Sequence, residues 1–445
     1  MSTRSNRRLE FPKSREFTAR IERVIPGGAH TYSKGRDQFP QEAPSGIVRG
    51  AGARVWDIDG NELIDWSMGL TSVSLGHGHP EVVDAVCAAI RNGVNFQRPS
   101  LLELEAAETF LDVAGTEMVK FARHGSVANT AAVKLARAFT GRALVAVPQE
   151  HPFFSFDDWF IGVTEADFGV PEAIKNFTVK FSYNDIDSVH ALFRQHPGEI
   201  ACVMMEPVKF DTPVDDFVHK VAELCAADGA VFVLDEMVTG LKFGVPGAAR
   251  YLGVEADLYT YGKGIANGFA AAAVTGRGDI MRLGGLEPEG ARKLFLLSTT
   301  HGAESAGLAA MVATLKLFAD GKIVENNWRG GAALRQRLDR VIAHHELDEH
   351  LKIIGYPCFM ALSVIGPEGR PDPAFQTLFL QEMIAAGVLF QGLFVLTPSH
   401  GAAELDETEA AFERAAATFR TALDQRSTEG LLVGPPTKPV FRKYN

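Results

Sequence analysis

Short apolar runs alternate with helical patterns through the middle of this 445-residue chain. Each run is rich in valine, alanine or methionine, and the clearest are Ala143–Val147, Ile200–Met205, Ala230–Leu234 and Phe269–Thr275. The segment Asp215–Ala227, which lies between two of them, repeats apolar residues at the spacing of one helix face. Strands buried on both faces read as continuous apolar runs, and intervening helices connect parallel strands. We therefore expect an α/β fold with a mainly parallel sheet, and ligands at the carboxyl ends of its strands.

The pattern changes after residue 300. Ala303–Ala319 and Trp328–His345 each predict a long helix, and a smaller α+β region follows to about Asp424. The last residues contain Gly434-Pro435-Pro436, which favours a tail that wraps a neighbour or extends freely. At 445 residues, the chain is long enough for two domains.

The composition disfavours several classes of partner. A net charge of −11 disfavours nucleic acid and anionic membranes. Apolar stretches such as Phe269–Val274 are far too short to span a membrane. Arg4, Arg7 and Arg8 are not followed by the apolar core of a secretory signal. We therefore expect a cytoplasmic protein that binds neither nucleic acid nor membrane.

The cysteines and histidines give no metal-binding pattern. The four cysteines are widely scattered and have no C-x-x-C spacing, which indicates reduced thiols rather than disulfides or a zinc site. His345 and His350 are five residues apart, so they would not share a helical face as the histidines of H-E-x-x-H do. We expect no metal.

Lys263 stands between Gly262 and Gly264, 28 residues after Asp235. The flanking glycines would let a planar carbonyl compound approach the backbone closely. A lysine amine in a low-dielectric pocket loses affinity for protons and becomes a nucleophile that forms a Schiff base. Asp235 ends an apolar run, where a carboxylate would pair with a pyridinium nitrogen. Pyridoxal phosphate requires both partners, although each residue alone also fits a solvated loop lysine or a helix cap.

A second feature fits the phosphate of such a cofactor. Gly125, Ser126 and Val127 precede an apolar helical pattern that Gly141 would end as a C-cap. The start of a helix offers free N–H groups and the positive end of its dipole to a phosphate. The same residues also fit an ordinary serine-capped helix. A P-loop is excluded at the lysine because Asp257 stands where that motif has its first glycine.

A collinear series of short motifs extends from about residue 20 to residue 425. Its members are Pro26–His30, Trp56–Asn61, Leu75–Pro80, Gly125–Asn129, Met205–Val208, Asp235–Gly240, Lys263 and Ser298–Gly302. This series resembles the class III (ω-type) aminotransferases, and especially their glutamate-1-semialdehyde aminomutase-like branch. The resemblance implies the aspartate aminotransferase-like fold (PLP fold type I), with a mainly parallel seven-stranded sheet in a large domain and a smaller α+β C-terminal domain.

The resemblance also implies domain boundaries and a homodimer with shared active sites. We expect residues 1–75 to pack with the small domain and the dimer partner, and residues 76–320 to form the large domain that binds the cofactor. The small domain would comprise residues 321–426, and residues 427–445 would form the tail.

The implied cofactor is pyridoxal 5'-phosphate (PLP). Lys263 would bind it as a Schiff base and would then carry the proton between substrate and cofactor. Asp235 would pair with the ring nitrogen. Glu206 stands where the family keeps a carboxylate near the cofactor's 3-hydroxyl and the substrate. These three residues are the expected catalytic set.

The resemblance further implies residues that hold the phosphate. Gly125, Ser126 and Val127 would donate main-chain hydrogen bonds, and Thr300 would add a hydroxyl from the neighbouring subunit of the homodimer.

The two faces of the ring would also be covered. Met237 would pack on one face. The family places an aromatic residue on the other face, ahead of a His-Gly pair that is missing here. Aligning Asp158-Trp159-Phe160 with the family puts Phe153 at that position, with Phe154 as the second choice.

Two departures from the branch concern the substrate. Val127 replaces a glutamate of the usual phosphate loop, and Lys34 stands where the aminomutases carry an arginine for the substrate carboxylate. A lysine offers a point charge instead of a bidentate fork, although Lys34 equally fits an exposed loop. Trp66 and His400 would lie on the substrate side by analogy, and a surface turn is an equal alternative for His400.

We therefore expect an aminotransferase that moves an amino group to a small carbonyl acceptor, namely an aldehyde, a keto acid, or a sugar-like or cyclic ketone. L-Glutamate is the expected donor because the family favours it. A glutamate-1-semialdehyde-type 2,1-aminomutase is the alternative, which Val127 and Lys34 disfavour. A non-catalytic binding protein of the same fold is a further alternative, against which the presence of Lys263, Asp235 and Thr300 argues.

Overall fold

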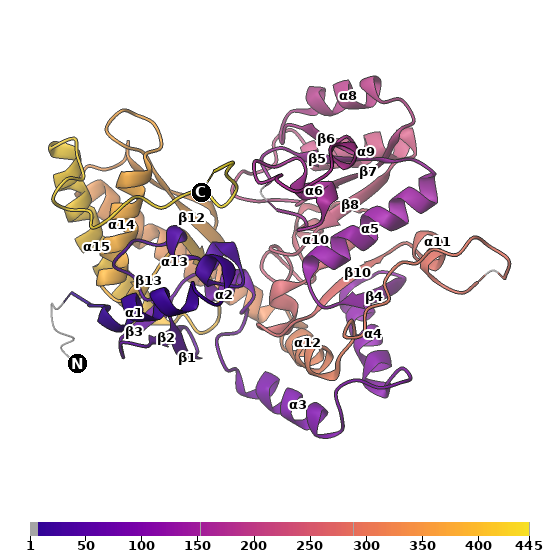
Figure 1. Ribbon diagram of the computed structural model, residues 1–445, viewed down its shortest axis with the longest axis horizontal. Coiled ribbons are helices and arrows are strands. Elements are labelled where there is room, and N and C mark those ends of the chain that lie inside the picture. The colour runs from indigo at the N-terminus through magenta and orange to yellow at the C-terminus, as the bar shows by residue number, and fades with distance from the viewer. Residues whose placement is uncertain (1–7, 152, 288, 445) are drawn as a thin grey trace. The chain divides into compact units, whose positions relative to one another are not determined.

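The structure is a computed structural model that describes residues 8–151, 153–287 and 289–444. Arg4 and Arg7, considered above, lie outside this part of the chain. The described residues form two compact units (Figure 1). Unit 1 comprises Met1–Leu70, Leu75–His79 and Glu325–Val440, and unit 2 comprises Thr71–Ser74, Pro80–Val324 and Phe441–Asn445, with only the described residues counted in each.

Unit 2 is built on a seven-stranded sheet. In spatial order its strands are β4 (Met118–Ala122), β10 (Ala272–Gly276), β9 (Leu258–Tyr261), β8 (Val231–Asp235), β7 (Ile200–Met205), β5 (Leu144–Pro148) and β6 (Thr178–Phe181). Neighbours from β9 to β6 pair in parallel, which confirms the mainly parallel sheet. Strand β10 instead pairs antiparallel with β9 and β4. The connection from β9 to β10 is too short for the crossover that a parallel pair needs.

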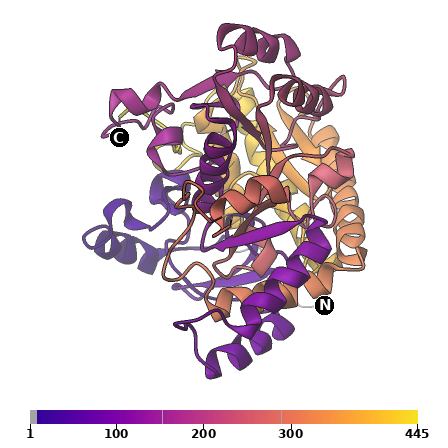
Figure 2. The same cartoon turned by 90° about the vertical axis from the view of Figure 1, so that its right-hand side faces the viewer.

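Alternate residues of the central strands face opposite layers of helices. In β7, Cys202 and Met204 belong to one buried cluster, which includes residues of α5 (Gly125–Thr140). Val203 and Met205 belong to a second cluster, with residues of α8 (Ile186–Gln195) and α9 (Phe217–Asp228). Helices therefore cover both faces of the sheet (Figure 2). Burial on both faces explains why these strands read as continuous apolar runs.

The other helices of unit 2 include several short ones in the connections. They are α3 (Pro80–Arg91), α4 (Leu101–Ala114), α6 (Asp158–Ile161), α7 (Glu172–Lys175), α10 (Ala248–Leu252), α11 (Gly278–Met281), α12 (Ser305–Phe318) and the 3-10 helices η4 (Lys263–Ala266) and η5 (Arg282–Gly284). Helices α9 and α12 confirm the two helical segments expected there. Helix α5 ends at Gly141, whose φ of 71° is the left-handed conformation of the predicted C-cap.

Unit 1 contains two smaller sheets and several helices. One sheet has the order β1 (Ile47–Ala51), β2 (Arg54–Asp57), β3 (Glu62–Asp65) and β13 (Val388–Leu389). The other has the order β11 (Leu351–Tyr356), β12 (Phe359–Val364) and β14 (Leu393–Val395). The helices are α1 (Pro12–Ile21), α2 (Met68–Thr71), α13 (Lys322–His344), α14 (Pro373–Ala385), α15 (Ala402–Asp424), η1 (Pro26–Gly28), η2 (Tyr32–Lys34) and η3 (Arg36–Gln38). The first three residues of α13 belong to unit 2, and the last residue of α2 does so as well.

The tail packs on its own chain, so it does not extend freely, which was one of the two expectations for it. Gln381 of α14 donates to the Leu431 carbonyl at 3.0 Å and accepts from the Val433 N–H at 2.8 Å. Further along, the Lys438 N–H donates to the Asp37 carbonyl at 2.9 Å. These bonds hold the proline-rich segment along unit 1. Its prolines lack N–H groups, so the segment has few backbone donors.

No helix among the described residues has both the length and the apolar character to cross a membrane.

Candidate active site

The ends of four neighbouring parallel strands bring the candidate residues of unit 2 to one edge of the sheet. Asp235 is the last residue of β8, Glu206 follows β7, His151 follows β5, and Lys263 follows β9. The carboxyl ends of parallel strands meet at the same edge, where α/β proteins bind their ligands. The structure therefore brings Asp235, Glu206 and Lys263 together, as the sequence predicts for a catalytic set.

Asp235 is buried and has both of its oxygens in hydrogen bonds. Oδ1 accepts from the Met237 N–H and Oδ2 accepts from the Asn129 side chain, each at 2.8 Å. Burial raises the pKa of Asp235 to about 7, and the neighbouring Glu206 carboxylate adds to the rise, whereas Lys263 opposes it. Burial removes the water that would stabilise the negative charge of the carboxylate. A carboxyl group in this position therefore binds a cationic partner strongly, because the cation would stabilise that charge instead.

Asn129 is a site residue whose role the sequence does not reveal. Its amide nitrogen donates to Asp235 and also to the Phe154 carbonyl at 2.7 Å, which fixes the orientation of the amide. Its Oδ1 atom is buried and has no hydrogen-bond partner within the described part of the chain. The sequence offers one sign of this role, because Asn129 is a polar residue on the buried, alanine-rich face of α5.

The Lys263 loop has an unusual backbone that several contacts hold in place. Lys263 has a φ of 47°, in the left-handed region that side chains other than glycine seldom adopt. The Ser74 hydroxyl donates to the Gly264 carbonyl at 2.6 Å, and the Ser74 N–H donates to the Asn267 side chain at 2.9 Å. These bonds fix the loop immediately after the lysine. Their residues are far apart in the sequence, so no local pattern reveals Ser74.

We expect Ser74→Ala to loosen this loop. The substitution removes the shorter of two hydrogen bonds to the buried Gly264 carbonyl, which also accepts from the Asn267 N–H at 3.3 Å, so the free energy of unfolding should fall by about 0.5–1.5 kcal/mol. Chemical denaturation measures that change. Ser67→Ala is a matched control for stability, because Ser67 is also buried and its hydroxyl has no partner among the described residues. Equal changes in both variants would contradict the role of Ser74.

The first turn of α5 lies beside Met237. Gly125 opens the helix, and its N–H and those of Ser126 and Val127 have no acceptor within the helix, as at any helix start. A Cβ atom on Gly125 would lie 2.7 Å from the Met237 sulfur, and one on Gly262 would lie 2.6 Å from the same atom. A side chain larger than hydrogen at either glycine would therefore make the Met237 thioether shift from its place between the helix start and the lysine loop.

Glu206 and His151 form the next part of the edge. The Glu206 N–H donates to Nδ1 of His151 at 3.2 Å, so the ring carries its proton on Nε2 when neutral. Burial and the charge of Lys209 lower the pKa of His151 to about 3. Burial raises the pKa of Glu206, against the opposing charges of Lys209 and Lys263. Lys209 is thus a second cation at this edge that sequence reasoning missed.

The two aromatic candidates occupy different environments. Phe154 is 1% exposed, and its ring contacts Phe160 edge-on with the centroids 5.5 Å apart. Phe153 is 45% exposed, and its ring stacks at 6.4 Å and 23° on Phe441 of the tail. Phe153, the first choice of the sequence alignment, is therefore the more accessible of the two rings, whereas Phe154 is an interior residue.

Thr300 is exposed in the segment before α12. Its carbonyl accepts from the Asn95 side chain at 3.0 Å, which holds the segment while the threonine side chain stays at the surface.

The remaining sequence candidates, Lys34, Trp66 and His400, belong to unit 1. Lys34 ends η2 and is exposed. Trp66 and His400 are buried and stack with a centroid distance of 4.1 Å. The Trp66 indole donates to Thr408 at 2.9 Å.

Both ring nitrogens of His400 are also occupied. Nδ1 accepts from the Thr397 N–H, and Nε2 lies 3.1 Å from the Asp65 carbonyl. Since these contacts use the polar atoms of both Trp66 and His400, they do not support the substrate contacts expected for the pair.

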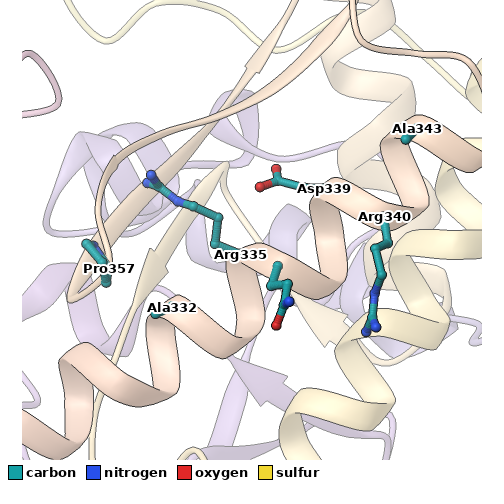
Figure 3. Close-up of a pocket in the computed structure, with 7 residues that line it drawn as sticks. Ala332, Arg335, Asp339, Arg340, Ala343 and Pro357 are labelled. Carbon is teal, nitrogen blue, oxygen red and sulfur yellow. The ribbon is translucent and has the colours of Figure 1, made fainter.

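Two other features of unit 1 lie apart from the candidate residues. A hollow of about 450 Å³ lies along α13, and none of its seven lining residues, which Figure 3 draws as sticks, is a candidate. Arg335 in this hollow donates to the Gly355 carbonyl at 2.6 Å. Elsewhere His344, His345 and Glu413 place their ligand atoms within 4.8 Å of one another, and His345 lies 2.8 Å from the carboxylate. We assign no function to either feature.

The chain is similar to known proteins over most of its length. The class-III aminotransferase family model matches residues 38–393. Glutamate-1-semialdehyde 2,1-aminomutase from Syntrophomonas wolfei subsp. wolfei is 32% identical over 404 residues, which cover 86% of this chain and 91% of that protein. A solved transaminase with PLP bound has a TM-score of 0.85 at 26% identity and covers 94% of this chain and 100% of its own. A β-phenylalanine aminotransferase from Variovorax paradoxus has a TM-score of 0.77 at 26% identity and covers 90% and 93%.

The chain belongs to the class-III aminotransferase family. It is a PLP-dependent enzyme of fold type I that acts on small molecules, which confirms the fold and the cofactor implied by the sequence motifs.

The residues at the sheet edge fit PLP. The buried carboxyl of Asp235, fixed by Asn129, suits a protonated ring nitrogen. The helix start at Gly125 suits a phosphate, because its N–H groups are free. Lys263 supplies the amine, and its loop is held by Ser74.

Proposed function

We propose that this enzyme is an aminotransferase that takes an amino group from L-glutamate and passes it to a small carbonyl acceptor. The observation that carries the proposal is the convergence of Lys263, Asp235 and the α5 start at the carboxyl edge of one parallel sheet. This set supplies a nucleophilic amine, a counter-ion for a ring cation and a phosphate site, which are the groups that amine transfer through PLP requires.

Each residue of the site would have a separate role in amine transfer. PLP, when bound, supplies an electrophilic carbonyl and a ring that withdraws electrons. The Asp235 carboxylate would hold a positive charge at the ring nitrogen, and Asn129 would keep that carboxylate in place. Nζ of Lys263 would act as the nucleophile, and it would later accept the proton from Cα of the substrate. Met237 and Phe153 would keep water from the two ring faces, and the N–H groups of α5 would bind the phosphate.

The environment of Val127 favours transfer of the amino group between two molecules over transfer within one molecule. This side chain packs against a cluster that includes Ala122, Ala128 and Met237. An apolar group here replaces the glutamate that the mutase branch places in its phosphate loop. The lysine at position 34 departs from the same branch, and its exposure gives it no fixed geometry.

A homodimer is part of the proposal. The Asn95 contact holds Thr300 with its side chain at the surface, where the hydroxyl would bind the phosphate of a second subunit.

The experiment measures products with one substrate and then with two. With L-glutamate alone, we expect about one 2-oxoglutarate per active site. Aldehydes, keto acids or ketosugars are then added one at a time. The true acceptor should give continuous release of 2-oxoglutarate. No 2-oxoglutarate in any arm would contradict the proposal.

The second candidate is a 2,1-aminomutase, which the identity to the Syntrophomonas wolfei enzyme favours. Continuous conversion of glutamate-1-semialdehyde without a co-substrate would establish it in place of the aminotransferase.

A further inference from the structure

Lys209 lies on a loop that its neighbours fix firmly. The loop begins at Glu206, whose N–H donates to His151 at 3.2 Å. The Tyr183 hydroxyl donates to the Pro207 carbonyl at 3.0 Å. Val208 is fully buried. Lys209 therefore leaves a rigid stretch of backbone immediately after the strand end that carries the catalytic carboxyl group.

The charge of Lys209 has no direct partner. Its side chain is half-buried, and it makes no hydrogen bond or ion pair within the described residues. The surrounding charges are mixed, because Glu206 and Asp211 attract the ammonium, whereas Lys263 repels it. His151 also lies close enough to feel its charge. Burial lowers the pKa of Lys209, and the charge of Lys263 adds to this effect. A half-buried cation without a paired anion is unfavourable, so an anionic ligand group would be bound well here.

We propose that the Lys209 ammonium binds a carboxylate of the amino-acid donor and so selects amino acids over simple amines. The inference rests on the proposed function, since it assigns the donor to the edge that holds Lys263. A lysine here gives a point charge that recognises a single carboxylate oxygen. This contact would compensate for Lys34, which lies exposed in unit 1 without a fixed partner.

A structural role for Lys209 makes a different prediction. If the lysine served only as a counter-ion for Glu206, its removal would change the protonation of that carboxyl group. Activity would then fall equally with all amino donors, whether or not they carry a carboxylate.

The test uses the PLP-loaded enzyme and the variant Lys209→Met, which keeps the apolar stem and removes the charge. We expect the KM for L-glutamate to rise by about 10- to 100-fold, the change that losing one charge-assisted hydrogen bond causes. The kcat should change little, and the half-reaction with 1-phenylethylamine, an amine without a carboxylate, should keep its wild-type rate. Lys209→Arg should restore part of the affinity. Lys220→Met is the matched control, because Lys220 is an exposed lysine on α9.

Calorimetry with glutarate provides a readout that does not depend on turnover. Wild-type enzyme should bind this dicarboxylate, and Lys209→Met should bind it at least about 10-fold more weakly. Absence of glutarate binding in the wild type, equal binding in both proteins, or equal losses with both donors would overturn the inference. Glutarate binding that depends on Lys209 in an enzyme that never forms 2-oxoglutarate would uphold the inference and refute the proposed donor reaction.

Discussion

Lys263→Ala should lower kcat by at least about 10³-fold, because the change removes both the nucleophile and the proton carrier. The assay is release of 2-oxoglutarate from L-glutamate with the acceptor present. Lys352→Ala, which removes an exposed lysine on β11, is the control and should keep full activity.

The backbone at Lys263 calls for a second variant. Alanine at a φ of 47° is strained, whereas asparagine tolerates this conformation well. Lys263→Asn should therefore fold at least as well as Lys263→Ala and be equally inactive. Added ethylamine should restore part of the proton transfer in the alanine variant. Retention of most activity by either variant would refute the assigned role.

Asp235→Asn should lower kcat by about 10²- to 10³-fold, because the neutral amide removes the charge that holds the ring cation. The amide also fits poorly. Both oxygens of Asp235 accept from N–H donors, so either orientation of an asparagine sets an NH₂ group against a donor. Asp235→Glu, which keeps the charge but moves it, should lose less activity than Asp235→Asn.

The same variant has a pH signature in the cofactor-free protein. The pKa of Asp235 rises from 3.8 to about 7 on folding, so the native state holds its proton more tightly than the unfolded chain. Its contribution to stability is fully present below pH 3.8 and is lost as the pH rises to about 7. The thermal midpoint of the cofactor-free wild type should fall over this window, and it should fall less steeply in Asp235→Asn. The pKa values of Glu206 and Glu236 are also raised, so the thermal midpoint of Asp235→Asn should still fall somewhat as the pH rises. Identical slopes in both proteins would contradict the assignment.

The sequence predicts those parts of the fold and site that local patterns encode. The apolar runs predict the central strands because these are buried on both faces. The positions of Lys263 and Asp235 at the carboxyl ends of strands can be predicted, because each follows a strand beside glycines or an apolar run. The antiparallel direction of β10 depends instead on the length of one connection, which an apolar run does not show.

Other parts of the site depend on contacts between distant segments. Ser74 and Gly264 are 190 positions apart, and only folding brings them together. The sequence does not show that the His400 ring stacks on Trp66, because 334 positions separate the two residues. Lys209 has no motif of its own, because the role that we propose for it rests on the lack of an ion-pair partner within the described residues.

The course of the last residues matters for anyone who handles this protein. After following unit 1, the chain brings Phe441 against Phe153, two residues before the hydroxyl group of Ser155 that lies 3.4 Å from the Ser126 carbonyl. An affinity tag fused close to Phe441 would therefore crowd the ring of Phe153, which we propose to cover the cofactor, and would compete with its natural stacking partner. Purification handles belong at the other end of the chain, and a tag at the carboxyl end should be cleaved before kinetic constants are compared.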